Sequence, residues 1–325
     1  MSPLRSVELH CHLDGSVRLT TIAELARQQG ISLARPVEQL ATVGPGRRSL
    51  VHYISAIDVA LEVLQTPEAL SRAATELVQD WHADGVVHGE VRFAPELHTR
   101  RGLPVREVID AVATGLQNGS RATGVSTSLI LSCMRPSDPK RTWQVVEEAA
   151  VHHAVVGIDI AGPELGVPLL PHAPAFRSGK AAGLRITVHA GEADGARRVW
   201  EAVDELGAER IGHGVRSSTD PALVKRLAED RITLELCPTS NVQTGAVPST
   251  HQHPVERFRM AGVPVSISTD ARTVSQVTLR SEFELLEREF GWTARTWADT
   301  QLSALSAAFL DEARRTRLAS RMHTD

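Results

Sequence analysis

Two histidines separated by a single residue, His10 and His12, lie in the stretch VELHCHLDGS, residues 7–16. The stretch alternates like a half-buried strand, so both imidazoles are expected on one face while Cys11 points to the other. Two imidazoles on one face can converge on a metal ion, although a lone strand histidine is more often a hydrogen-bonded core residue. The remaining ligands must decide between these interpretations.

Further polar residues end three of the later apolar stretches. TVHAGE places His189 at the end of a strand and Glu192 in the turn that follows. IGHG places His213 between two glycines, and SISTDAR places Asp270 at the last position of a strand. If these strands form a parallel barrel, all four side chains meet at one mouth. Nitrogen and oxygen ligands without thiolate favour zinc or another first-row divalent ion in a catalytic site.

The positions of these residues depend on an alternation of short β-branched stretches with amphipathic segments of helical spacing. The expected strands are Val7–Leu13, Val86–Ala94, Ser126–Cys133, Val155–Ala161, Arg185–Ala190, Arg210–His213, Ile232–Pro238 and Val263–Asp270. Helical crossovers make neighbouring strands parallel. Eight such units predict an α/β fold, a closed (β/α)8 TIM barrel forming one domain over residues 1–325. A doubly wound open sheet is the alternative, but no glycine-rich nucleotide turn follows the first strand.

Two regions exceed what a minimal barrel needs. Residues 19–66 contain GPGRRS, residues 44–49, followed by helical spacing over 50–64. An insertion there would lie over the carboxyl end of the barrel, so we expect a helical lid or substrate wall. Extra packing helices alone are the alternative. The tail after Phe290 predicts two terminal helices.

The composition excludes several classes of protein. Hydrophobic residues make up 42% and charged residues 23%, as in globular proteins. The net charge is -4 without a basic block, so no nucleic-acid partner is expected. Three distant cysteines fit a reducing compartment, and neither a signal core nor a membrane-length apolar run occurs. We therefore expect a cytoplasmic protein with no membrane partner, and infer no oligomeric state.

Six motifs occur in order across nearly the full chain: VELHCHLDGS, GIDIAGPE, VHAGE, RIGHG, CPTSN and STD. Together they resemble those of the adenosine deaminase family of metal-dependent amidohydrolases. The resemblance implies a (β/α)8 barrel and one Zn²⁺ ion held by His10, His12, His189 and Asp270. It also implies hydrolytic deamination of a small-molecule aminopurine nucleoside. The simplest case is adenosine or deoxyadenosine, converted to inosine or deoxyinosine plus ammonia.

The same resemblance assigns roles to further residues. Glu192 matches the proton donor to the purine N1, and His213 matches the residue that orients and deprotonates the attacking water. Together with Asp270, His213 would pass that proton to the departing nitrogen. Gly162 matches a backbone contact to N3 of the base, and Asp14 matches the carboxylate that hydrogen-bonds the 5′ side of the sugar.

Each of these residues also has an ordinary structural interpretation. Glu192 could be a carboxylate favoured by a helix dipole, and His213 a packed loop histidine. Gly162 could supply only a positive φ, and Asp14 could cap a turn. The remaining histidine pairs, His152–His153 and His251–His253, are expected to be surface or packing residues.

The chain departs from the family pattern directly after the metal-binding aspartate. Well-known members of the family carry a second aspartate there, which hydrogen-bonds N7 of adenine, whereas Ala271 and Arg272 follow Asp270 here. Loss of that contact would cost about 1.5–3 kcal/mol if nothing replaced it. Either another group compensates, with Arg272 as one candidate donor, or the substrate differs.

Several alternative functions therefore stay open. The substrate could be a modified adenine nucleoside, such as aminodeoxyfutalosine, or free adenine. A non-catalytic zinc- and nucleoside-binding protein is disfavoured by the presence of both Glu192 and His213. A hydrolase of phosphate or amide bonds would often need a second metal bridged by a carboxylated lysine. VVGIDIAG and RITVHA contain no lysine, which favours a single metal.

Overall fold

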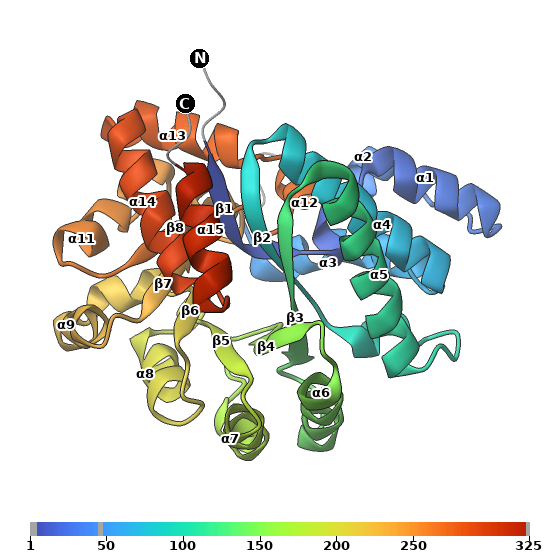
Figure 1. Ribbon diagram of the computed structural model, residues 1–325, viewed down its shortest axis with the longest axis horizontal. Coiled ribbons are helices and arrows are strands. Elements are labelled where there is room, and N and C mark those ends of the chain that lie inside the picture. The colour runs from blue at the N-terminus through green and yellow to red at the C-terminus, as the bar shows by residue number, and fades with distance from the viewer. Residues whose placement is uncertain (1–4, 45–47, 323–325) are drawn as a thin grey trace.

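Eight parallel strands form the centre of the molecule in the computed structural model, which describes residues 5–44 and 48–322. Each strand pairs with the next in chain order from β1 to β8. A bridge between Cys11 and Asp270 brings the end of β8 back against β1. Figure 1 shows the resulting barrel with helices around its outside. The predicted (β/α)8 TIM barrel is confirmed, and the open-sheet alternative is wrong.

All eight expected strands are present, and their ends differ from the predicted ones by at most three residues. They are β1 (Ser6–His12), β2 (Val86–Phe93), β3 (Ser126–Met134), β4 (Val155–Ala161), β5 (Arg185–Ala190), β6 (Arg210–His213), β7 (Thr233–Leu236) and β8 (Val265–Ile267). Their valines, isoleucines and leucines bury one side of each strand against the surrounding helices.

The connections between the strands are helical. The α-helices are α1 (Leu19–Gln28), α2 (Val37–Ala41), α3 (Leu50–Val63), α4 (Pro67–Ala83), α5 (Val105–Thr123), α6 (Pro139–Val151), α7 (Ala173–Ala181), α8 (Ala196–Asp204), α9 (Pro221–Glu229), α10 (Pro238–Gln243), α11 (Val255–Met260), α12 (Arg272–Ser275), α13 (Leu279–Phe290), α14 (Ala294–Ala307) and α15 (Glu312–Met322). Short 3-10 helices are η1 (Asp14–Ser16), η2 (Pro95–His98), η3 (Leu170–His172), η4 (Val215–Thr219) and η5 (Thr250–Gln252). No helix within the described ranges is long and apolar enough to cross a membrane.

The interior of the barrel is ionic, whereas most barrels of this kind fill it with branched apolar side chains. Arg92 on β2 reaches Glu235 on β7 at 2.7 Å and Asp159 on β4 at 3.4 Å. Arg210 on β6 reaches the same Glu235 at 2.7 Å and Glu90 on β2 at 2.6 Å. Three of these four contacts join non-adjacent strands across the barrel, and the Arg210–Glu235 pair joins the neighbours β6 and β7, so the polar side chains fill its centre. They lie directly beneath the residues expected to do chemistry.

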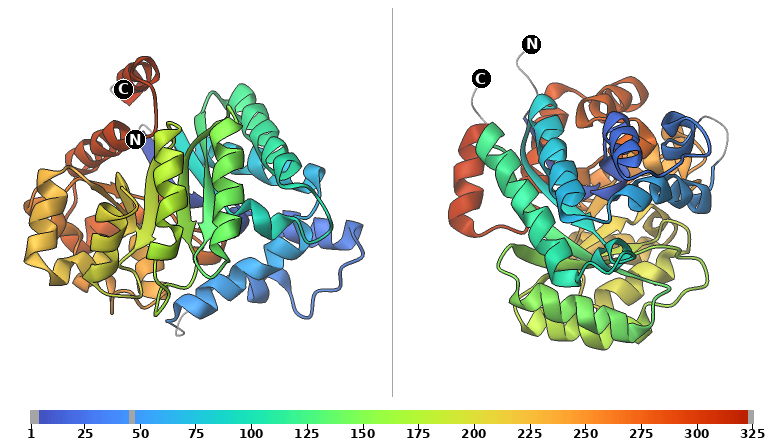
Figure 2. Two further views of the ribbon diagram at one scale, coloured as in Figure 1. Left: turned by 90° about the horizontal axis from the view of Figure 1, so that it is seen from below. Right: turned by 90° about the vertical axis from the view of Figure 1, so that its right-hand side faces the viewer.

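The two additional regions lie on opposite sides of the molecule. Figure 2 shows α1–α3 (blue) on one side and α15 (red) on the other in both views. The tail after Phe290 forms the two predicted helices, α14 and α15. Their Leu305 and Leu318 pack into one cluster with Val7 and Leu9 of β1. Of the GPGRRS stretch, residues 45–47 lie outside the described residues.

Candidate metal centre and active site

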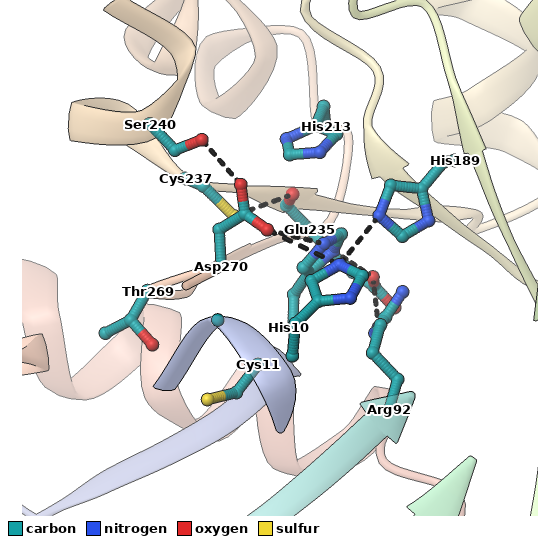
Figure 3. Close-up of polar contacts among 12 residues, drawn as sticks. His10, Cys11, Arg92, His189, His213, Glu235, Cys237, Ser240, Thr269 and Asp270 are labelled. Carbon is teal, nitrogen blue, oxygen red and sulfur yellow. Dashed lines mark hydrogen bonds and ion pairs between the residues drawn. The ribbon is translucent and has the colours of Figure 1, made fainter. Parts of the chain in front are cut away.

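Five side chains from four strand ends gather at one point above the ionic interior. His10 and His12 come from β1, His189 from β5, His213 from the end of β6, and Asp270 follows β8. The possible ligand atoms of His10, His12 and His189 lie within 4.8 Å of one another, as do those of His10, His213 and Asp270. Figure 3 shows His10, His189, His213 and Asp270 directed toward a common space.

The backbone at two of these positions is unusual. His213 and Asp270 both adopt the left-handed conformation, with φ of 64° and 63°. Such a conformation costs a non-glycine residue about 1–3 kcal/mol and is found mainly where function requires it. Here it turns each side chain at the end of its strand toward the shared point. The strain is therefore stored where the candidate ligands meet.

The hydrogen bonds at Nδ1 of His10 and His189 leave the Nε2 atom of each ring available to bind a cation. Nδ1 of His10 donates to Glu235 at 2.8 Å, and Nδ1 of His189 donates to Asp159 at 3.0 Å. A proton on Nδ1 of a neutral imidazole leaves a lone pair on Nε2. Burial lowers the pKa of His10 to about 4, which keeps that ring neutral. Histidines that bind metals are commonly oriented by carboxylates in this way.

The free lone pairs face one another. Nε2 of His12 lies 3.1 Å from Nε2 of His189, and Nε2 of His10 is buried with no hydrogen-bond partner among the described residues. Oδ1 of Asp270 lies 3.6 Å from Nε2 of His10 and 3.4 Å from Nε2 of His12. Its other oxygen, Oδ2, accepts a hydrogen bond from Ser240 at 2.5 Å. Three nitrogen atoms and one carboxylate oxygen are thus available to a single divalent ion.

Glu192 is a second buried acid, with no partner for one of its oxygens. Its Oε1 is buried and has no hydrogen-bond partner in the described part of the chain. Burial raises the pKa of Glu192, so the protonated form is favoured and can donate a hydrogen bond. Oε2 lies 3.7 Å from Nε2 of His213. A buried carboxyl group with a raised pKa thus lies beside the candidate ligands.

The turn that carries Glu192 is held by another carboxylate, Glu164. Its oxygens accept hydrogen bonds from four consecutive backbone N–H groups, those of residues 191–194, at 2.6–3.0 Å. Because Glu164 follows β4 and the turn follows β5, this contact ties two neighbouring strand ends together. The position of Glu192 is thus set by backbone contacts, independently of any ligand.

A cavity of about 890 Å³ opens above these residues. It is lined by His12, Asp14, Leu50, Tyr53, Ile54, Ile57, Asp58, Leu61, Ala94, Leu97, Arg100, Ser132, Met134, Ala161, Gly162, His189, Glu192, His213 and Asp270. Helix α3, from the region between β1 and β2, supplies one wall. Asp14 lies in this cavity, and burial raises its pKa to about 6. Gly162 has a φ of 100°, which favours glycine, and it also faces the cavity.

The family model "Adenosine deaminase" matches residues 5–325. The chain belongs to the adenosine deaminase family. It is 36% identical over 315 residues to an adenosine deaminase of Clostridium perfringens, covering 95% of each chain. Its fold matches that of an adenine deaminase from Arthrobacter aurescens with a TM-score of 0.92 and 27% identity, over 99% of this chain and 98% of that one.

A further solved structure is an amidohydrolase from Burkholderia ambifaria with bound Zn, which matches with a TM-score of 0.91 and 29% identity. The match covers 98% of this chain and 90% of that chain. These relatives and the family match identify the protein as a hydrolytic deaminase that acts on adenine-type substrates. Because these relatives include both an adenosine and an adenine deaminase, they do not distinguish between the two substrates for this deaminase.

The two residues that depart from the family pattern do not line the cavity of this deaminase. Ala271 is fully buried in an apolar cluster that includes Tyr53 and Val274. The guanidinium of Arg272 forms an ion pair with Asp84 at 2.9 Å. Arg272 is therefore engaged elsewhere, and the hypothesis that it replaces the lost N7 contact is not supported by its position.

The residues that orient the candidate ligands were not predicted from the sequence. They are Arg92, Asp159, Glu235, Ser240 and Asn241. One signal was available: His88, Glu90 and Arg92 occupy alternate positions of β2 within an otherwise apolar strand. Alternation with period two places such residues on one face, so charges there predict an ionic barrel interior.

Proposed function

We propose that this deaminase converts adenosine or deoxyadenosine to inosine or deoxyinosine and ammonia in a zinc-dependent reaction. The observation that carries this proposal is the arrangement at the floor of the cavity. A buried carboxylic acid, Glu192, has a free oxygen there, beside three converging imidazoles and Asp270. A deaminase needs both a proton donor to the purine ring and a site that activates water.

One Zn²⁺ would be held by Nε2 of His10, His12 and His189 and by the carboxylate of Asp270. The unpartnered, buried Nε2 of His10 and the absence of thiolate among these donors fit zinc. The bound Zn in the related amidohydrolase supports the same assignment. When bound, the ion would act as a Lewis acid that makes water nucleophilic near neutral pH.

Glu192 then donates its proton to N1 of the base as negative charge develops there during attack at C6. Its raised pKa matches this task, because a donor must hold its proton at the working pH. Gly162 faces the base through its backbone, with no side chain to obstruct a ring. Helix α3 limits access of bulk water, since Tyr53, Ile57 and Leu61 line the cavity.

The outer part of the cavity favours a sugar over a phosphate. Two carboxylates, Asp14 and Asp58, line it and can accept hydrogen bonds from hydroxyl groups. The lining cation Arg100 pairs with Glu62 at 2.9 Å, which reduces its attraction for an anion. An uncharged nucleoside therefore fits the lining better than a nucleotide.

Free adenine is a second candidate substrate. The specific observation in its favour is the fold match to the adenine deaminase of Arthrobacter aurescens. Adenine would use the floor of the cavity and leave the carboxylates of Asp14 and Asp58 without a partner from the substrate. The two candidates therefore differ in their dependence on Asp14.

Ammonia release from adenosine, deoxyadenosine, adenine and 5′-modified adenosines, with and without chelator, tests the proposal. We expect the highest kcat/KM for the unmodified nucleosides, and loss of activity with chelator. Asp14→Asn should lower kcat/KM for nucleosides by about 10- to 100-fold, because a charge-assisted hydrogen bond is lost, and leave adenine unaffected. A preference for adenine would favour the second candidate. No turnover of any aminopurine by the metal-replete protein would refute the deaminase proposal.

A further inference from the structure

A buried chain of hydrogen bonds leads from His213 away from the cavity. Nδ1 of His213 lies 3.0 Å from Nδ2 of Asn241, and Oδ1 of Asn241 lies 3.1 Å from Nε2 of His253. His253 is 4% exposed although it follows the exposed η5 in a polar segment. Neither Asn241 nor His253 lines the cavity, and this series of hydrogen bonds connects both to it through His213.

The direction of these hydrogen bonds is fixed at the His253 end by a backbone donor. The backbone N–H of Val255 donates to Nδ1 of His253 at 3.2 Å. A backbone N–H cannot accept, so Nδ1 of His253 carries the lone pair and the ring proton is on Nε2. Burial lowers the pKa of His253 to about 3, so this ring stays neutral and holds only that proton. His253 must therefore donate to Asn241.

A second backbone donor fixes the amide of Asn241. The N–H of Cys237 donates to Oδ1 of Asn241 at 3.3 Å, on the same oxygen that accepts from His253. Turning the amide over would place its NH₂ group against two donors, which leaves buried donors unpaired and costs about 1–3 kcal/mol each. The NH₂ group consequently faces His213 and donates to its Nδ1.

We propose that Asn241 and His253 are positioning residues that hold His213 with its ring proton on Nε2. In this tautomer Nδ1 accepts from Asn241, and the N–H on Nε2 points toward the floor of the cavity. A proton on Nδ1 would face the NH₂ group of Asn241, so the other neutral tautomer is disfavoured. This inference rests on the proposed deamination only for its consequences for catalysis.

The consequence is a change of role for His213. A ring that carries its proton on Nε2 donates a hydrogen bond to the attacking water oxygen and cannot remove a proton from it. The resemblance to the family implied the opposite role, deprotonation. Asp270, whose Oδ1 faces the same point, is then the proton acceptor on this side of the site.

The ring nitrogens of His213 report this arrangement directly. Long-range ¹H–¹⁵N correlation spectra of the zinc-loaded full chain, labelled with ¹⁵N-histidine, distinguish a protonated from a bare ring nitrogen. The His213 signals are assigned by their absence from a His213→Gln spectrum. We expect a bare Nδ1 and a protonated Nε2 for His213, and the same pattern for His253.

Asn241→Asp reverses the hydrogen bond between residue 241 and Nδ1 of His213, because a carboxylate accepts where the amide NH₂ group donated. We expect the His213 proton to move to Nδ1, and kcat to fall about 10²- to 10⁴-fold with little change in KM, as for a catalytic histidine held in the wrong tautomer. His253→Phe should lower kcat about 5- to 10-fold, the worth of one buried hydrogen bond. His253→Gln, which retains a donor, should recover most of that loss.

The neighbouring His251 provides the matched control, because it is exposed and belongs to the same His-x-His segment. His251→Phe should leave the spectrum and kcat unchanged. A proton on Nδ1 of His213 in the wild-type spectrum would overturn the inference. So would an Asn241→Asp variant that folds with an unchanged His213 spectrum. The spectra require no turnover, so they are informative even if no aminopurine is deaminated.

Discussion

Oε2 of Glu235 accepts a hydrogen bond from Nδ1 of His10 at 2.8 Å and also lies 2.7 Å from Nη2 of Arg92. One carboxylate thus links a candidate zinc ligand to the ionic interior of the barrel. Burial disfavours the charged form of Glu235, but Arg92 and Arg210 outweigh burial and hold its pKa well below the usual value. The charge on Glu235 is therefore retained and orients His10.

Glu235→Gln should lower zinc affinity about 10- to 100-fold, because the residue that orients His10 loses its charge. It should also lower the free energy of unfolding by about 3–5 kcal/mol, since two buried arginines lose a partner. Competition with a chelator and urea denaturation measure the two effects. Glu209→Gln, whose side chain pairs with Arg185 away from the centre, is the control and should retain zinc affinity. Unchanged zinc affinity in Glu235→Gln would contradict this account of the centre.

Glu192→Gln tests the proton donor. We expect kcat to fall about 10²- to 10⁴-fold while zinc content stays unchanged, because the amide cannot transfer a proton to N1. Ammonia release and elemental analysis of the same preparation measure both quantities. Asp194→Asn removes a nearby carboxylate that pairs with Arg198 and should retain activity. Equal activity of Glu192→Gln and wild type would show that the proton comes from elsewhere.

Ala271→Asp restores the aspartate found in well-known members of the family, but we expect it to destabilise this chain without raising activity. The methyl group of Ala271 lies 2.4 Å from where a Cβ on Gly15 would stand. A larger, charged side chain there is overpacked and unpaired, which should cost at least about 2 kcal/mol. Thermal unfolding measures the cost, with Ala271→Ser as the milder comparison. A stable Ala271→Asp variant with higher kcat/KM for adenosine would show that position 271 faces the substrate.

Glu282 on α13 predicts a pH dependence of stability. Burial raises its pKa to about 8 from an ordinary value of 4.5, so the unfolded chain releases this proton more readily than the folded one. Glu282 therefore lowers the free energy of unfolding increasingly as pH rises from 4.5 toward 8, and this effect levels off above that pH. Glu282→Gln should raise the free energy of unfolding more at pH ~8 than at pH ~5, by a few kcal/mol.

Urea denaturation at the two pH values measures this difference. Glu284→Gln, at an exposed position of the same helix, is the matched control and should show no such pH dependence. An equal effect of Glu282→Gln at both pH values would show that Glu282 is ionised in the folded protein throughout.

The strand order and the meeting of His10, His189 and Asp270 could be predicted because both follow from periodicity along the chain. Parallel strands place their carboxyl ends together whatever the intervening helices do. The contacts of Arg92 with Glu235 and Asp159 could not be predicted, since they join non-adjacent strands across the barrel. Their geometry depends on strand tilt and side-chain conformation, which no local pattern encodes.

The surroundings of Ala271 and Arg272, which depart from the family pattern, could not be predicted from the sequence either. Ala271 was recognised as a lost contact, but its burial against Tyr53 and Val274 depends on where α3 packs. Arg272 follows the candidate ligand Asp270 directly, and only the structure shows its pairing with Asp84. The position of Ala271 and Arg272 next to Asp270 in the sequence therefore did not reveal whether their side chains contact the cavity.

The proposed reaction depends most on a single zinc ion held by His10, His12, His189 and Asp270. Its most direct test is a titration of metal-depleted protein with Zn²⁺, following ammonia release from adenosine. Activity should be absent without metal, rise linearly, and level off at one equivalent of zinc per chain. Full activity in the metal-depleted protein, or a rise that continues to two equivalents, would contradict it.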